Sequence, residues 1–335
     1  MNLKTMNKTT RSNFITYAMV IVAFVVVQAM ASTGGISSSL KGQLVPICAY
    51  IVMAISLNLT VGVLGELSLG HAGFMSVGAF SGVIAAIYFG QTIENTAVVM
   101  ILAMAVGGFF AAVVGVLVGV PVLRLSGDYL AIVTLAFGEI IKGIVNNLYV
   151  GMDANGLHFC MIKNTLEMEG GKMLLNGPMG LTGIPRIATF TMGFVLIMVC
   201  LIVIFNLVNS KSGRAIMALR DNKIAAQSVG INVTSYKLMA FVISAAMAGM
   251  AGVLFATNFS TVVASKFDIN TSILVLVFVV LGGLGNMRGS IIAATVLTVL
   301  PEVLREFSEY RMLVYAIVLI VMMLATNNPT LKNAI

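Results

Sequence analysis

Long apolar segments separated by short polar ones constrain this chain more than any other feature. A helix needs roughly 20 apolar residues to cross the hydrocarbon core of a bilayer, and segments of about that length recur along the whole sequence. Charged residues make up 9% of the chain, against about 25% in a typical soluble domain. We therefore expect an all-α polytopic membrane protein with about ten transmembrane helices. The predicted spans are about 13–31, 44–61, 72–89, 96–120, 129–149, 188–209, 237–257, 271–284, 289–300 and 311–326.

The first predicted span follows a basic N-terminal segment and ends near Ala29-Met30-Ala31. Small residues of this kind resemble a signal-peptidase site, so a cleaved signal peptide is one interpretation. The polar residues Thr16 and Tyr17 and the length of the segment fit a signal sequence poorly. We therefore expect a retained anchor.

The distribution of basic residues predicts the orientation, because cytoplasmic segments carry an excess of Lys and Arg. With ten spans and the N-terminus inside, the cytoplasmic segments hold eleven basic residues and the external segments hold seven. Both termini are then predicted to lie in the cytoplasm. The cytoplasmic set is Lys4, Lys8, Arg11, Arg124, Lys211, Arg214, Arg220, Lys223, Lys237, Arg288 and Lys332, and the external set is Lys41, Lys163, Lys172, Arg186, Lys266, Arg305 and Arg311.

The sequence offers no pattern typical of catalysis, metal binding or nucleic-acid binding. The net charge of +7 is compatible with a nucleic-acid partner, but the placement of the charges favours membrane orientation, so we expect no nucleic acid. Cys48 and Cys200 lie in apolar runs and Cys160 in a polar segment, which predicts neither a disulfide framework nor a metal site. A phosphate-binding GxxxxGK[ST] motif and a nucleophile with a nearby base are missing from the sequence. We expect no enzyme activity and no cofactor on this chain.

A polar, basic segment at 211–230, KSGRAIMALRDNKIAAQSVG, lies between two long apolar segments. The predicted topology places it in the cytoplasm, within a loop at 210–235. We interpret it as a docking helix for a cytoplasmic partner. This chain would then be the membrane subunit of a complex in which a separate protein supplies the energy for transport. The alternative is a basic helix that lies on anionic lipid.

The longest external segment is predicted at 150–187, with GPMGLTGIP near its end. At nearly forty residues it exceeds the usual length of a connecting loop, which favours a functional surface. We expect contact with an external partner, and a simple connector is the alternative.

Two glycine-rich tracts interrupt the apolar runs, VGVLGELSLGHAG at 61–73 and VLGGLGNMRGS at 280–290. They share the pattern LGxL. Paired glycine-broken segments in the two halves of a transporter indicate a central pathway built from broken or re-entrant helices. Close packing of helices through small residues is the equal alternative. The candidate pathway glycines are Gly70, Gly282, Gly283 and Gly285.

Ionisable residues inside predicted spans are the other pathway candidates, because a charge in the membrane should face the helix bundle or water. Glu139 lies mid-span with Lys142 three residues later on the same helical face, so a structural ion pair competes with a pathway role. Thr134 precedes them in the same segment. Glu66 and His71 lie in the first glycine tract, where a packing or capping role for the histidine is the alternative to transport.

Five strings together resemble the inner-membrane permeases of branched-chain amino-acid ABC importers, of the LivM type. They are LNLTVGVLGELSLGHAGFMSVGAF, LSGDYLAIVTLAFGEIIKGIVNN, GPMGLTGIP, GRAIMALRDNKIAAQSVGIN and VLGGLGNMRGS, and the likeness runs from about 44 to 325. The resemblance implies a type II ABC importer-like fold forming a single transmembrane domain over 1–335 in a bacterial inner membrane. It further implies a homologous LivH-type permease, two cytoplasmic ATPase subunits that bind ATP-Mg, and a periplasmic amino-acid-binding protein.

In that family 211–230 is the coupling loop, whose general pattern is Glu-Ala-Ala, three residues and Gly. This sequence has Ile224 where the pattern has Glu, followed by the expected Ala225, Ala226 and Gly230. An acidic contact with the ATPase is therefore missing here. The resemblance implies contact with the ATPase through Gly213, Arg214, Arg220, Asp221, Ala225, Ala226 and Gly230.

The expected function is therefore import of leucine, isoleucine or valine by the membrane subunit of an ATP-driven importer. Urea and sugar permeases of the same superfamily are alternatives, although GLTGIP favours the amino-acid type. An ion-coupled carrier is a further alternative. Its coupling would require acidic residues along the spans, where Glu139 stands nearly alone.

Overall fold

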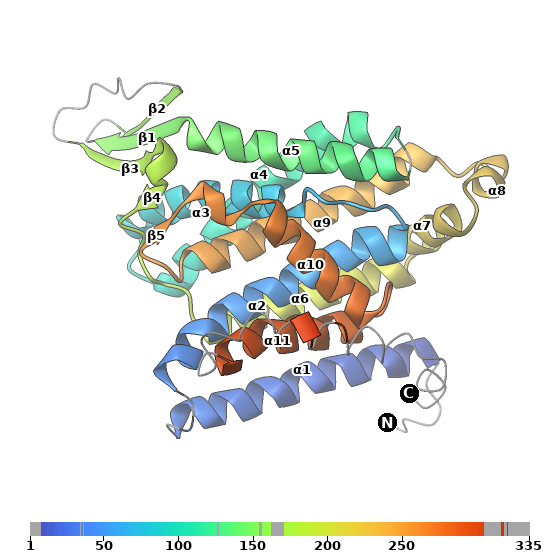
Figure 1. Ribbon diagram of the computed structural model, residues 1–335, viewed down its shortest axis with the longest axis horizontal. Coiled ribbons are helices and arrows are strands. Elements are labelled where there is room, and N and C mark those ends of the chain that lie inside the picture. Colours follow the sequence, from blue (N-terminus) through green and yellow to red (C-terminus); the bar gives the residue numbers. More distant parts are fainter. Residues whose placement is uncertain are drawn as a thin grey trace.

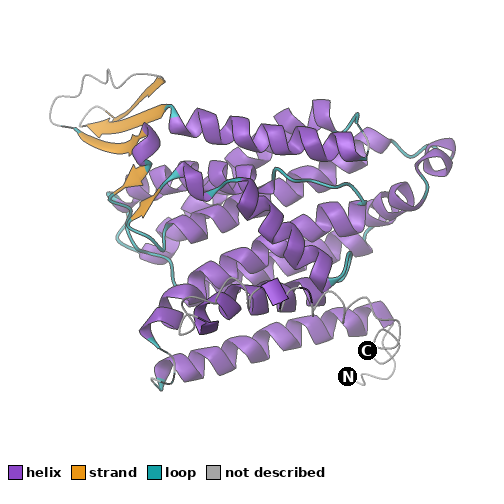
Figure 2. Ribbon diagram, viewed as in Figure 1, coloured by secondary structure: helices purple, strands orange, loops and turns teal. Residues whose placement is uncertain are grey.

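The computed structural model describes residues 8–33, 35, 37–125, 127–153, 156–161, 171–304, 316–317 and 320. In this part of the chain, helices form a bundle with a small β-sheet at one end (Figures 1 and 2). The helices are α1 (Lys8–Ser32), α2 (Ser38–Asn58), η2 (Leu59–Leu64), α3 (His71–Gly90), α4 (Thr96–Val122), α5 (Asp128–Asn146), η3 (Gly177–Met179), α6 (Phe190–Asn209), α7 (Lys211–Asp221), α8 (Lys223–Ser228), α9 (Val233–Ala256), η4 (Ala264–Lys266), α10 (Ile269–Gly282) and α11 (Met287–Val303).

Seven helical segments in the described part are long and apolar enough to cross a membrane, where the sequence predicted ten. The helix α5, which carries Asp128, Glu139 and Lys142, and the helix α11, which has 17 residues, are not among the seven. The predicted span at 311–326 lies outside the described residues, apart from 316–317 and 320. The count of ten is therefore not confirmed. The seven are Asn13–Ser32, Ser38–Leu64, His71–Gly90, Thr96–Val122, Phe190–Asn209, Val233–Ala256 and Ala264–Gly282.

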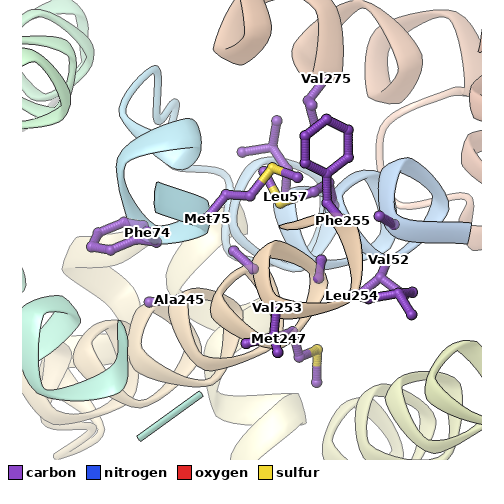
Figure 3. Packing of buried hydrophobic residues seen from close by; sticks show 14 of the residues in the cluster. Val52, Leu57, Phe74, Met75, Ala245, Met247, Val253, Leu254, Phe255 and Val275 are labelled. Carbon is purple, nitrogen blue, oxygen red and sulfur yellow. The ribbon is translucent and has the colours of Figure 1, made fainter. Parts of the chain in front are cut away.

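The centre of the bundle is built from α2, α3, α4 and α9, which pack through small residues. A Cβ atom on Gly78 of α3 would overlap the backbone of Gly249 in α9, and one on Gly252 would overlap the carbonyl of Met75. Close backbone approach of this kind is typical of membrane helices. Figure 3 shows the larger side chains that fill the remaining space, among them Leu57 of α2.

The helices differ greatly in burial although their compositions are similar. In the most apolar stretch of α2 and η2, 94% of the residues are buried inside the protein, against 11% in α1. Figure 1 shows α1 along one edge of the bundle and α5 along the opposite edge. The α2 helix is thus the central element, and α1 and α5 lie at the periphery.

The segment predicted as an external loop at 150–187 contains most of a β-sheet, which corrects the all-α prediction. The strands β1 (Leu148–Asp153), β2 (Gly156–Met161), β3 (Lys172–Asn176), β4 (Leu181–Thr182) and β5 (Thr261–Val262) pair in the antiparallel order β2-β1-β3-β4-β5. The GPMGLTGIP string makes the turn into β4. Gly180 has φ +72 and lies against the carbonyl of Val262, where no other residue fits.

The sheet and the helices α7 and α8 lie at opposite ends of the bundle (Figure 1). The connection from α9 to α10 contributes β5, so it lies at the sheet end. The sequence predicted that 150–187 and 210–235 occupy opposite sides of a membrane, and this arrangement is consistent with that prediction. Which end faces the cytoplasm stays a prediction from charge.

Candidate functional site

The basic segment at 211–230 forms two helices, not the single helix that the sequence predicted. The break falls at Asn222, whose extended backbone (φ −155) cannot continue α7. The Asn222 side chain instead caps α8 by accepting a hydrogen bond from the backbone N–H of Ala225 at 3.0 Å. Asparagine is favoured at this position because it satisfies a free donor of the first turn.

The first helix, α7, packs its apolar face against α6, α9 and η2. Ile216 and Leu219 are buried on that face. Gly213 lies at the corner between α6 and α7, where a Cβ atom would overlap the carbonyls of Leu207 and Val208. Gly213 is therefore a packing residue, while the neighbouring Arg214 is exposed and donates to the carbonyl of Asn209 at 3.2 Å.

The second helix, α8, presents an exposed apolar tip. Ile224 is 79% exposed and Val229 is 75% exposed, and Ala225 lies between them on the surface. Ala226, in contrast, is buried against the protein. Gly230 ends the segment with φ +86, the left-handed conformation that glycine commonly adopts just after a helix. We refer to Ile224, Ala225 and Val229 as the α8 tip.

Arg220 of α7 reaches from the basic segment into the first glycine tract. Its Nη1 donates to the carbonyl of Gly62, which lies in the π-helix η2, at 3.1 Å, although the two residues are 158 apart in sequence. Its side chain also covers Gly65, where a Cβ atom would lie 2.5 Å from Arg220 Cγ. A π-helical turn leaves irregular backbone hydrogen bonds and often marks a functional site. Asp221 accepts from the same guanidinium at 3.0 Å.

The two glycine tracts that resembled each other in sequence meet at this point. Asn58, at the end of α2, accepts from the backbone N–H of Gly285 at 2.8 Å and donates to Ser290 Oγ at 2.9 Å. A Cβ atom on Gly62 would overlap both Asn58 and Gly285. Gly285 has φ +81 in the turn between α10 and α11. We call Asn58, Gly62, Gly285 and Ser290 the glycine junction.

The tight turn between α10 and α11 explains the other glycines of the second tract. Gly282 and Gly289 bring the backbones of the two helices into direct contact, and Gly283 has φ +91 at the end of α10. These contacts favour the close-packing interpretation for Gly282, whereas the positive φ of Gly283 is a requirement of the turn.

A buried ion pair attaches α9, the helix that follows the basic segment, to the same region. Lys237, in the second turn of α9, donates to Glu66, which directly follows η2 and Gly65. The side chains are 4% and 13% exposed. The helices on both sides of α8, α7 through Arg220 and α9 through Lys237, therefore hold the segment that follows α2.

The remaining pathway candidates of the first tract are packed in the interior. Gly70 lies against the backbone of Thr134, whose hydroxyl accepts from the N–H of Leu69 at 3.0 Å. His71 is buried, with Nε2 2.8 Å from Ser56 Oγ. This geometry fits the packing interpretation of the histidine. A role in the pathway stays a prediction for Glu66, Gly70, His71 and Thr134.

Glu139 and Lys142 form the ion pair predicted from their spacing, at 2.9 Å. Both side chains are partly exposed, at 36% and 25%, on the outer side of α5. The same helix exposes Tyr129 and Ile132. The outer face of α5 thus combines large apolar side chains with a charged pair.

The sequence did not predict that Asn58 joins the two glycine tracts, or that Lys237 forms an ion pair with Glu66. Asn58 had one visible signal, since it is a polar amide at the end of an apolar run immediately before a glycine tract. Lys237 was counted only as an orienting charge. Among the described residues, no group of three or more His, Cys, Asp or Glu side chains could hold a metal ion.

Comparison with known proteins identifies the family of the chain. Residues 39–325 match the family described as "Branched-chain amino acid transport system / permease component". No solved structure matches the chain.

The curated relatives have related names. The chain is 37% identical over 286 residues to the high-affinity branched-chain amino acid transport system permease protein LivM of Escherichia coli strain K12. The aligned region covers 82% of this chain and 66% of that protein. It is 25% identical over 300 residues to the probable branched-chain amino acid transport permease protein LivM of Methanocaldococcus jannaschii, covering 78% and 79%. The ribose import permease protein RbsC of Haemophilus influenzae is 31% identical over 123 residues, covering 34% and 38%.

The match spans just under two thirds of the Escherichia coli protein, 66% of its length. The family match covers most of the present chain, from residue 39 to residue 325. The chain belongs to the family of branched-chain amino acid transport system permease components.

Proposed function

We propose that this chain is the transmembrane permease subunit of an ATP-driven importer of leucine, isoleucine and valine. One observation carries the proposal: the exposed α8 tip is joined, through Arg220 and Lys237 on its two flanks, to the junction between the two glycine tracts. A docking surface at one end of the helix bundle is thereby connected to the π-helix η2 and to the glycine tract around it. ATP-Mg binds to two separate cytoplasmic ATPase subunits in this proposal.

The coupling step follows from this geometry. Closure of the ATPase subunits moves α8, and the attached α7 and α9 transmit the displacement to η2 through the Gly62 carbonyl and Glu66. The glycine junction passes it on to α10 and α11 through Gly285. A nucleotide shifts the conformation only by binding the two states with different affinity, so these contacts must differ between the inward-open and outward-open forms.

The outer face of α5 is the surface we assign to the homologous second permease. Its Glu139–Lys142 pair is partly exposed, and charges in a membrane are costly on a lipid-facing surface. The segment from η2 to α3, which contacts α5 through α3 and Leu69, has four buried polar atoms without a hydrogen-bond partner among the described residues: Thr60 Oγ1, Ser68 Oγ, His71 Nδ1 and Ser76 Oγ. A buried polar group without a partner costs about 1–3 kcal/mol, which favours a pathway that carries water or substrate near this interface.

The β-sheet at the opposite end is the surface we assign to the periplasmic amino-acid-binding protein. Phe159 of β2 and Met179 of η3 are 62% and 64% exposed there. Exposed apolar side chains on an ordered sheet are typical of a protein-binding surface.

Transport by the reconstituted complex of this chain, the second permease, the two ATPase subunits and the binding protein tests the proposal. We expect uptake of labelled leucine that stops when ATP is removed while ion gradients are held constant. Unlabelled isoleucine and valine should compete, and urea and ribose should not. Competition by ribose alone would instead support a sugar permease, the class of the Haemophilus influenzae relative. Uptake by this chain alone in ATP-free liposomes would contradict the proposal and favour an ion-coupled carrier.

Docking of the ATPase is expected to depend on the α8 tip. Replacing Ile224 and Val229 together by Ser removes two of the most exposed apolar side chains near the basic segment. Burial of such a side chain contributes about 1.5–3 kcal/mol, so the affinity of the purified chain for the ATPase should fall at least about tenfold. Met179→Ser, an equally polar change at the sheet end, is the control and should leave that affinity unchanged. Equal binding by the double variant would show that the ATPase docks elsewhere.

A further inference from the structure

Two cavities lie one above the other along α1. The first has a volume of about 280 Å³ and lies between α1, α2, α6 and α11. Its lining is almost entirely apolar and includes Met19, Phe24, Ile47, Phe194 and Ile292. The second, of about 160 Å³, is formed by the next turns of α1, α6 and α11, toward the end of the bundle where α7 begins. We call the two cavities together the α1 groove.

The second cavity differs from the first in its chemistry. It is lined by the polar side chains of Asn13, Thr16, Asn209 and Asn286, and by Arg288. The Arg288 guanidinium donates to Thr16 Oγ1 at 2.7 Å, which orients it along this wall. The α1 groove therefore has a long apolar part and a cationic, amide-rich end.

These two parts match the depth of one bilayer leaflet. The α1 residues that line the groove run from Asn13 to Val27, which is about 21 Å at a rise of about 1.5 Å per residue. One leaflet including its headgroup region is about 20–22 Å thick, half of the roughly 40–45 Å bilayer. A single lipid molecule can place its headgroup at the cationic end and an acyl chain along the apolar part.

The position of α1 also favours lipid over a protein partner. The α1 helix is the least buried of the seven candidate spans and lies at the edge of the bundle opposite α5 (Figure 1). The face with the charged pair, which needs a protein neighbour, is thus on the far side. Because little of α1 is buried by the described residues, we assign its outer surface to the bilayer.

We infer that the α1 groove binds one anionic phospholipid, with its phosphate at Arg288 and an acyl chain between α1, α6 and α11. Arginine favours phosphate oxygens because its guanidinium forms charge-assisted hydrogen bonds with them. Basic pockets between membrane helices on the cytoplasmic side select anionic headgroups for the same reason. The bound lipid fastens α1, little of which is buried by the described residues, to the turn between α10 and α11. The inference does not depend on the transported substrate.

Fluorescence quenching by brominated lipids tests this site, because the chain has no tryptophan of its own. A single reporter is placed in the apolar cavity as Phe24→Trp, and a control reporter is placed on the outer face of α4 as Phe109→Trp, where the side chain is 65% exposed. The purified full chain is reconstituted in vesicles that contain phosphatidylglycerol and phosphatidylcholine, with one or the other brominated.

We expect the Phe24→Trp reporter to show about a fivefold preference for phosphatidylglycerol, the factor that corresponds to about 1 kcal/mol for one basic residue near the membrane surface. The Phe109→Trp reporter should show none. Adding Arg288→Gln to Phe24→Trp should abolish the preference. Adding Arg124→Gln, which removes an exposed basic residue just beyond α4, should preserve it.

Two results would overturn the inference. Equal quenching of the Phe24→Trp reporter by both lipids would show that the groove does not select an anionic headgroup. Absence of quenching would show that protein fills the groove, either another segment of this chain or a second copy. Unchanged quenching of Phe109→Trp across all variants confirms that each variant remains folded in the membrane.

Discussion

Gly62→Ala should abolish most of the uptake by the reconstituted importer. The added Cβ atom would overlap Asn58 and the backbone of Gly285, so η2 must separate from the turn between α10 and α11. Overpacking of this kind costs about 1–3 kcal/mol, and the loss of a buried hydrogen bond adds about 1–3 kcal/mol. Because about 1.4 kcal/mol corresponds to a factor of ten, we expect uptake to fall at least about tenfold. ATPase docking should be retained, since the α8 tip is unchanged.

Gly42→Ala is the matched control for this prediction. Gly42 lies in α2, the helix that continues into η2, and nothing is within 4 Å of the position that its Cβ atom would occupy. The substitution should leave uptake unchanged and raise stability slightly, because Ala is the better helix former. Uptake, ATPase activity and thermal unfolding are measured for both variants. Wild-type uptake by Gly62→Ala would show that the glycine junction does not have to stay closed during transport.

Lys237→Met should destabilise the chain more than any other single change of charge in the described residues. It leaves the Glu66 carboxylate, which is 13% exposed, without its partner. Breaking a buried ion pair by removing one member costs about 3–5 kcal/mol, because a buried charge remains uncompensated. Adding Glu66→Gln to Lys237→Met removes that charge and should restore part of the loss. The measurement is the free energy of unfolding of the purified chain in detergent.

The Glu139–Lys142 pair provides the control, because both of its side chains are partly exposed. In an exposed pair solvent screens the interaction, which is worth about 0–1 kcal/mol. Lys142→Met should therefore change the free energy of unfolding of the isolated chain very little. Equal stability of the Lys237→Met single variant and the Lys237→Met, Glu66→Gln double variant would show that the pair with Glu66 does not hold the loop to α9.

Much of the candidate site could be recognised in the sequence. The basic segment at 211–230 and the Glu139–Lys142 pair were both predicted from residue type and spacing. These features are local, because each depends on residues less than about one helical turn or one loop apart. The likeness between the two glycine tracts was also visible, although the sequence does not show that they touch.

The corrections concern features that local pattern does not determine. Asn222 breaks the docking segment into two helices because its side chain caps α8, and a single asparagine in a helical pattern does not reveal that choice. The strand β5 (Thr261–Val262) joins the sheet beside β4, with Leu181 opposite Val262, although these two residues are 81 positions apart in the sequence. Segments as short as β4 and β5 fit a loop equally well, so the sequence does not identify them as strands until the partner strand is known.

The sequence by itself determined that the chain is a helical membrane protein of this permease family, because apolar length and ordered motifs are properties of single segments. Only the tertiary structure decided that α2 is the core and α1 the periphery, and that Arg220 and Lys237 hold one loop from two sides. Lipid tails are about as apolar as a protein interior. The hydropathy of a helix therefore does not show whether the helix is buried in the protein or faces lipid. Contacts between residues more than 150 positions apart then follow from the packing of whole helices.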